Sequence, residues 1–195
     1  MDTPMNINDQ QAKESLEMIQ QTTEKTKKAL ASHASPWLIL WGALWVAAYT
    51  TCHFYGEFAG YIFALMGIIG TIGSGILIWL DKTKGPVKTD SKNPTDKKIL
   101  WIWFILSVYV VIWIFIMSPS SGLQTNVFII TAVMFAYIIM GVFYEVPLLT
   151  IIGIFVTGLS VLAYYLFPAY YCLTIAIFGG GTLLGTGIYI RLKWR

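Results

Sequence analysis

Six long apolar runs restrict the fold of this chain more than any other feature, because none of them contains Asp, Glu, Lys or Arg. A helix of about 18 or more apolar residues matches the thickness of a lipid bilayer. In hydrocarbon each backbone N–H and C=O must be paired inside the protein, and a helix pairs them within the segment. We therefore predict an all-α polytopic membrane protein, a bundle of six transmembrane helices at 37–54, 59–80, 99–117, 126–144, 147–167 and 169–190.

Composition argues against the main alternatives to this fold. Strands of a membrane β-barrel are short and alternate in polarity, whereas these runs are apolar on every face. Soluble domains carry about 25% charged residues, and this chain carries 12% charged and 56% hydrophobic residues. We expect the polar remainder to form an N-terminal amphipathic helix within 1–36, a basic loop at 81–98 and a basic tail at 191–195.

The positive charges predict the orientation of the chain. All 13 Lys and Arg lie in the N-terminal segment, in the loop between the second and third runs, and at the C-terminal end. With six spans these segments share one side of the membrane, which the positive-inside rule makes cytoplasmic. We expect both termini in the cytoplasm, and we expect contact with anionic lipid headgroups from Lys25, Lys27, Lys28, Lys82, Lys84, Lys97, Lys98, Arg191, Lys193 and Arg195.

Aromatic residues near the ends of the runs support the same arrangement. Amphipathic rings gather at both membrane–water interfaces, where they form belts. The tyrosines expected in the outer belt are Tyr49, Tyr55, Tyr61, Tyr164, Tyr165, Tyr170 and Tyr171.

Residues 6–33 have the pattern of an amphipathic helix, with Asn8 and Gln11 spaced as a capping box. Its thin apolar stripe consists of Ile7, Leu16, Ile19, Thr23 and Leu30. Two interpretations stay open, because this helix can lie on the inner leaflet, held by its lysines, or dock a cytoplasmic partner or a second copy. Ser35 and Pro36 then predict the start of a separate first transmembrane helix.

The residues with the most reactive chemistry lie at the expected outer side. Cys52, His53 and Glu57 are all competent zinc or copper ligands. Adjacent Cys and His side chains diverge on a helix and no paired-ligand motif accompanies them, so we predict no metal and no cofactor, and we keep these three residues for the alternative of a metal or redox protein. Cys172 begins the last run on the same side, and a disulfide with Cys52 is an open alternative to two free thiols.

Known catalytic signatures are missing from the sequence, including H-E-x-x-H, the Walker A lysine and G-x-S-x-G. Intramembrane charge, which marks ion paths and proton relays, is also missing. The basic loop lacks the Arg and aromatic residues that contact nucleic-acid bases, so we expect no nucleic-acid partner. We predict a non-enzymatic accessory, regulatory or assembly protein, with a small transporter or channel subunit for a neutral or small solute as the alternative.

Small residues gather on the second and sixth runs. Gly67, Gly70 and Ser74 form one stripe, and Gly181 and Gly185 share a helix face four residues apart. Such positions let two helix backbones approach closely, so we predict helix packing there. Because "GSGILI" at 73–78 resembles "GTGIYI" at 185–190, three repeated helical hairpins are a further hypothesis.

The whole chain resembles small, uncharacterised bacterial membrane proteins with six helices. The similarity lies in "KKALASHASPWLILWGALW", "VMFAYIIMGVF" and "LAYYLFPAYYCL", and in the glycine-rich last run with its basic end. The resemblance is one of architecture and local wording. It implies a protein of the bacterial inner membrane and brings no known activity.

Overall fold

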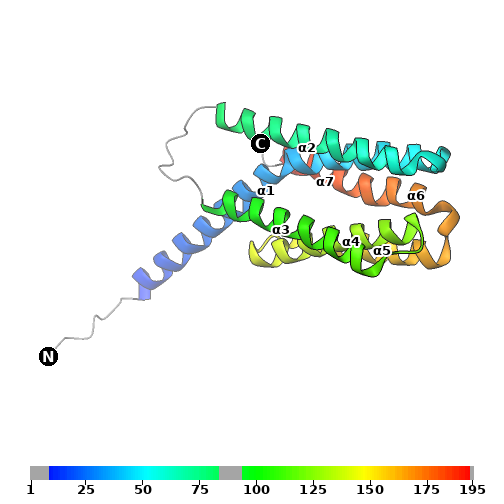
Figure 1. Ribbon diagram of the computed structural model, residues 1–195. Helices are drawn as coiled ribbons and strands as arrows, with labels where there is room; N and C mark the ends of the chain where they lie inside the picture. Colours follow the sequence, from blue (N-terminus) through cyan, green and yellow to red (C-terminus); the bar gives the residue numbers. More distant parts are fainter. Residues whose placement is uncertain (1–8, 84–93, 194–195) are drawn as a thin grey trace.

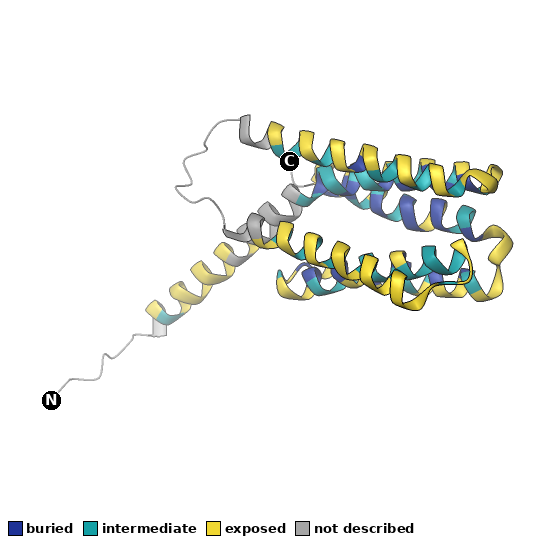
Figure 2. Cartoon of the chain, viewed as in Figure 1, coloured by how far each residue is buried: buried dark blue, intermediate teal, exposed yellow. Residues whose placement is uncertain are grey.

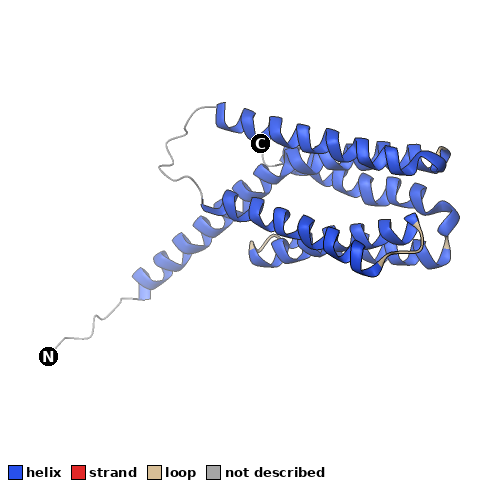
Figure 3. Cartoon of the chain, in the orientation of Figure 1, coloured by secondary structure: helices blue, strands red, loops and turns tan. Residues whose placement is uncertain are grey.

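The computed structural model describes residues 9–83 and 94–193, which form helices joined by short connections (Figures 1 and 3). No residue in these two ranges belongs to a strand. The 3-10 turns η1 (Gly56–Phe58) and η2 (Pro168–Tyr170) precede α2 and α6, and the π-helical segment η3 (Ile175–Gly180) joins α6 to α7. The α-helices are α1 (Asp9–Phe54), α2 (Ala59–Thr83), α3 (Pro94–Met117), α4 (Gly122–Phe143), α5 (Pro147–Leu166), α6 (Tyr171–Thr174) and α7 (Gly181–Lys193).

Six helical segments are long and apolar enough to cross a membrane, so the predicted all-helical, multi-pass fold is confirmed for the described residues. Their ends differ slightly from the predicted ones. For example, α4 begins at Gly122 because the Ser121 side chain accepts a hydrogen bond from the Gln124 N–H and caps the helix. The segments are Ala34–Phe54, Gly56–Leu80, Lys98–Met117, Gly122–Phe143, Pro147–Leu166 and Pro168–Lys193.

Helix α1 corrects the prediction of two separate helices at the N-terminal end. It is a single helix of 46 residues that contains Pro36. The Ser35 hydroxyl, expected to cap a new helix, instead donates a hydrogen bond of 2.8 Å to the Gly187 carbonyl oxygen of α7. The Ser35 hydroxyl, which the sequence indicated as a helix cap, therefore links α1 to α7 by a hydrogen bond.

The helices pack in two groups. One group places α2, η3 and α7 against α1, and the other places α3 and α5 against α4, with α5 contacting η3 and α6 across the groups (Figure 1). Only 6% of the most apolar stretch of α2 and 0% of that of α3 is buried, whereas the other four spans bury about a third. The exposed faces of α2 and α3 (Figure 2) are apolar, a composition that suits contact with lipid tails.

The N-terminal part of α1, the facing ends of α2 and α3, and the C-terminal end of α7 lie at the same end of the bundle (Figure 1). We call the opposite end, where α1 meets α2 and α5 meets α6, the distal end. Lys98, Arg191 and Lys193 are exposed near the first end. Expectations outside the described part of the chain concern the side chains of Lys25, Lys27, Lys28, Lys82 and Lys97, and the whole of Lys84 and Arg195.

Candidate functional site

Helix α7 and the preceding η3 pack closely against α1 through glycines. A Cβ atom added at Gly180 would lie 2.7 Å from the Val46 backbone nitrogen, and one added at Gly187 would lie 2.9 Å from the Ile39 backbone nitrogen. Contacts this short leave no room for a side chain, so the two backbones approach as in other small-residue interfaces of membrane helices.

The glycine pair chosen from the sequence lies off this contact face. A Cβ at Gly185 would meet nothing within 4 Å, and one at Gly181 would meet only the Ala176 carbonyl oxygen at 4.0 Å. Within one copy of the chain these two glycines do not pack against another helix, and packing against a second copy stays a prediction. Gly181 and Gly185 are four residues apart, about one helical turn, and Gly180 and Gly187 are seven residues apart, about two turns. Both spacings put the two glycines of a pair on one helix face, so spacing alone could not show which pair contacts α1.

On α2, only part of the predicted small stripe contacts another helix. A Cβ at Gly70 would lie 2.5 Å from the nearest atom of the Trp41 ring of α1, whereas one at Gly67 would meet nothing within 4 Å. Ser74 is half-buried. The glycines of α2 and α7 therefore do not pair with each other, because α2 and α7 each pack against α1. The hairpin repeat that would make these helices equivalent stays a prediction.

Polar side chains from four helices meet near the distal end of the bundle. Tyr49 and Cys52 lie within one turn of each other on α1, Tyr171 and Cys172 are adjacent on α6, and the two cysteine sulfurs are 3.2 Å apart. Hydrogen bonds extend the group to α4 and α5. We call this group the distal polar cluster, which consists of Tyr49, Cys52, Asn126, Ser160, Tyr171 and Cys172.

Two hydrogen bonds tie the tyrosines of the cluster to neighbouring helices. The Tyr49 hydroxyl donates to the Asn126 Oδ1 at 2.6 Å, which links α1 to α4. The Ser160 and Tyr171 hydroxyls are 2.9 Å apart and link α5 to α6. Both tyrosines had been expected in an interfacial belt, but only 3% of Tyr49 and 1% of Tyr171 is exposed. That expectation is wrong for these two residues because their hydroxyls have partners inside the bundle.

Asn126 was missed because it opens a predicted span and resembles a helix-start residue. In the structure it lies one turn inside α4, which begins at Gly122. A polar side chain at such a depth is favoured when another helix offers a partner. The signal in the sequence was an Asn inside an apolar run, together with a Tyr at a similar depth in another span.

The two cysteines of the cluster come from the two ends of the chain. The Cys52 Sγ on α1 and the Cys172 Sγ on α6 are 3.2 Å apart, and both are free thiols. The sequence placed them at the same end of the bundle, and the structure places them side by side. Of the groups in the cluster, the thiols have the lowest ordinary pKa values and so are the most readily converted into nucleophiles.

The other two candidate metal ligands, His53 and Glu57, have surroundings that differ from those of the two thiols. The His53 ring contacts the rings of Phe54 and Tyr170, with centroids 5.2 and 6.0 Å away. Glu57 belongs to the exposed turn η1. Within the described residues, no three His, Cys, Asp or Glu side chains come close enough together to hold a metal ion. The structure therefore does not assemble Cys52, His53 and Glu57 into a ligand set.

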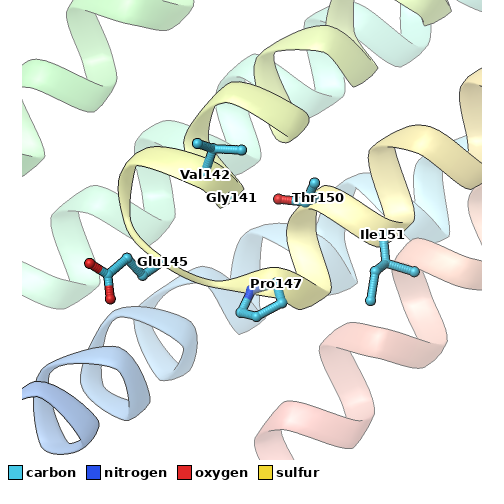
Figure 4. A pocket seen from close by; sticks show the side chains of 6 residues that line it. All are labelled: Gly141, Val142, Glu145, Pro147, Thr150 and Ile151. Carbon is cyan, nitrogen blue, oxygen red and sulfur yellow. The ribbon is translucent and has the colours of Figure 1, made fainter. Parts of the chain in front are cut away.

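A hollow of about 360 Å³ lies at the turn between α4 and α5 and is open to the surroundings (Figure 4). The N–H of Val146 bonds to the Gly141 carbonyl and that of Glu145 to the Val142 carbonyl, at 2.8 and 3.2 Å, which is the Schellman pattern of a helix end. The Glu145 side chain points away from Thr150 (Figure 4). Because its polar groups do not converge, the hollow has the features of a helix junction rather than of a ligand site.

Comparison with known proteins finds no matching family, no related curated protein and no similar solved structure. The likeness to small bacterial membrane proteins stays a prediction. The candidate functional features therefore come from the structure of this chain, and they are the N-terminal part of α1 and the distal polar cluster.

Proposed function

We propose that this chain is an accessory, regulatory or assembly protein of the bacterial inner membrane that acts by binding another protein through the N-terminal part of α1. The observation that carries the proposal is the continuity of α1 from Asp9 into the bundle. We call residues 9–33 of this helix the arm. At about 1.5 Å per residue the arm is about 37 Å long.

The direction of the arm favours docking over a position on the lipid surface. A helix that lies on the leaflet runs roughly at right angles to the spans, whereas α1 continues as one helix through Pro36 and its arm leaves the bundle obliquely (Figure 1). The arm points away from the bundle (Figure 1). Its apolar face is therefore carried away from the headgroups, into the space where a soluble partner or domain is found.

Apolar side chains on the arm are open to a partner. Leu16 is 58% and Met18 66% exposed, and the arm is exposed along most of its described length (Figure 2). Burying one such side chain contributes about 1.5–3 kcal/mol. Leu16 and Ile19 lie three residues apart on one face, which fits an amphipathic helix laid into an apolar groove. The stripe is narrower than a coiled-coil seam, so we favour a different protein over a second copy.

The charges support a cytoplasmic position for the arm. Every Lys and Arg of the chain lies in segments that six spans bring to one side, and the positive-inside rule makes this side cytoplasmic. The partner is then a cytoplasmic protein or the cytoplasmic part of a membrane protein. Anionic lipid beside the bundle attracts the same cations.

Photocrosslinking in bacterial membranes tests the proposal. A photoreactive amino acid replaces Leu16 in one full-length variant and Gln21 in the other, which is five residues on and about 140° around the helix. Both positions are exposed in the structure. We expect a discrete protein adduct from position 16 and at least tenfold less of it from position 21, and mass spectrometry then identifies the partner.

Three results would contradict this function. Equal adducts from both positions would show contact without a preferred face. Adducts with lipid alone at position 16 would place the arm on the membrane surface. Adducts consisting only of a second copy of the chain would replace the heterologous partner with self-association.

A further inference from the structure

Two thiols that lie 120 residues apart in the chain approach each other near the distal end of the bundle. The Cys52 Sγ and Cys172 Sγ are 3.2 Å apart, and the sulfurs of a disulfide are about 2.05 Å apart. The packed helices α1 and α6 therefore already hold the two sulfurs within about 1.2 Å of a covalent bond.

The two thiols differ in access to the surroundings. Cys52 is buried, with 7% of its surface exposed, whereas Cys172 is only half-buried. Cys172 follows the turn η2, in which Tyr170 is exposed. An oxidant that approaches the distal end therefore meets Cys172 first, and Cys52 is placed to react second.

We propose that Cys52 and Cys172 are a redox modification site, at which thiol–disulfide exchange with a disulfide-bearing oxidant forms an intramolecular disulfide. Cys172 gives up its proton to solvent, and its thiolate attacks the oxidant disulfide, which forms a mixed disulfide and releases one oxidant thiolate. The deprotonated Cys52 then attacks the Cys172 Sγ and expels the second oxidant thiolate. The protein loses two electrons and two protons, and the oxidant gains them as two thiols.

The bond would join the first transmembrane helix to the last one at the distal polar cluster. Tyr49 is less than one turn from Cys52, and Tyr171 is adjacent to Cys172. The crosslink would therefore fix the helices that carry the Tyr49–Asn126 and Ser160–Tyr171 contacts. With the termini in the cytoplasm, the distal end faces the oxidising side of the membrane, where disulfides persist.

Mass spectrometry of the purified full-length chain tests this inference. The protein is reduced with dithiothreitol, freed of reductant, and treated with oxidised glutathione. We expect a Cys52–Cys172 linked peptide, faster migration on a non-reducing gel, and a fall from two maleimide-reactive thiols to none in the denatured chain. Dithiothreitol should restore both thiols.

A matched variant separates proximity from general thiol reactivity. In the double variant Thr51→Cys/Cys52→Ser the first thiol moves one position along α1, to an exposed residue about 100° around the helix. We expect at least tenfold less intramolecular linked peptide from it, with glutathione adducts at both cysteines instead. Size-exclusion chromatography and circular dichroism confirm that each protein is folded.

The inference is overturned if the wild-type chain yields only separate glutathione adducts, if its thiols stay unmodified, or if the linked peptides join two copies of the chain. Equal linkage in the wild type and the Thr51→Cys/Cys52→Ser variant would also overturn it, because the position of Cys52 would then be irrelevant. None of these results depends on the binding partner of the arm.

Discussion

Glycines set the distance between α1 and the last transmembrane segment, because they leave no side chain between the two backbones. At Gly187 an added Cβ would lie 2.7 Å from the Ile39 Cγ1 and 3.0 Å from the Leu38 Cβ. The Gly187 carbonyl oxygen also accepts the Ser35 hydroxyl hydrogen bond. Close packing and a buried hydrogen bond thus meet at one residue, so a single added methyl group should disturb both.

Replacement of this glycine by alanine should destabilise the bundle. We expect Gly187→Ala to lower the free energy of unfolding by about 1–3 kcal/mol, because the added methyl group forces two backbones apart. Gly185→Ala is the matched control on the same helix, and we expect it to change stability by less than about 1 kcal/mol, in the direction of greater helix stability. Reversible unfolding in detergent micelles measures both values. Equal destabilisation by the two variants would contradict the assigned contact face.

Residue-level contacts were the least predictable part of the molecule. Gly179, Gly180 and Gly181 lie at three different angles around the helix axis. The sequence does not show which of them faces the partner helix, because this depends on how the two helices are placed. Tyr49 and Tyr171 have the composition signal of belt residues, yet their hydroxyls are bonded inside the bundle. Apolar surroundings in a membrane do not distinguish lipid from protein, so a sequence gives little evidence about which face of a span is buried.

At the scale of elements, the spans were predictable because each has to be long and apolar enough to cross a bilayer. The course of α1 was harder to predict. Pro36 is disfavoured inside a helix and favoured in a first helical turn, so the local preference indicated a helix start. In the structure the helix continues through it, and Ser35 bonds to α7. The Ser35–Gly187 hydrogen bond between α1 and α7 thus accompanies a proline in a helix interior, where proline is disfavoured.

The arm should be separable from the stability of the bundle. We expect deletion of residues 1–24 to change the free energy of unfolding of the bundle by less than about 0.5 kcal/mol, because residues 11–22 are mostly exposed. The same deletion should abolish binding to the protein captured from position 16. Unfolding in detergent micelles and copurification measure the two effects.

A point variant controls for the length of the helix. Leu16→Gln keeps the full arm and removes an exposed apolar group, so it should weaken copurification of the partner at least tenfold at unchanged stability. Loss of bundle stability on deletion would show that the arm is part of the fold, and retained binding after deletion would place the partner site elsewhere.

In the whole molecule, helix association rests on a few specific contacts rather than on apolar area. Lipid tails solvate apolar side chains as well as other helices do, so close approach and hydrogen bonds decide the arrangement. The α1–α7 contact has Gly180 and Gly187. The α4–α5 contact has Gly153, where an added Cβ would lie 2.8 Å from the Met134 carbonyl oxygen. The distal polar cluster then links the two helix groups through the Tyr49–Asn126 bond.

The orientation of this assembly in the membrane is open to a direct test. Cysteines are placed one at a time at Lys13, on the arm, and at Glu57, in the distal turn η1, in a chain that also carries Cys52→Ser and Cys172→Ser. Lys13 and Glu57 are both exposed. In intact bacterial cells we expect an impermeant maleimide to label Glu57→Cys at once and Lys13→Cys only after permeabilisation, because the positive-inside rule predicts a cytoplasmic position for the 13 cations. Labelling of Lys13→Cys in intact cells would reverse the topology and move the arm, with its partner, to the outer side.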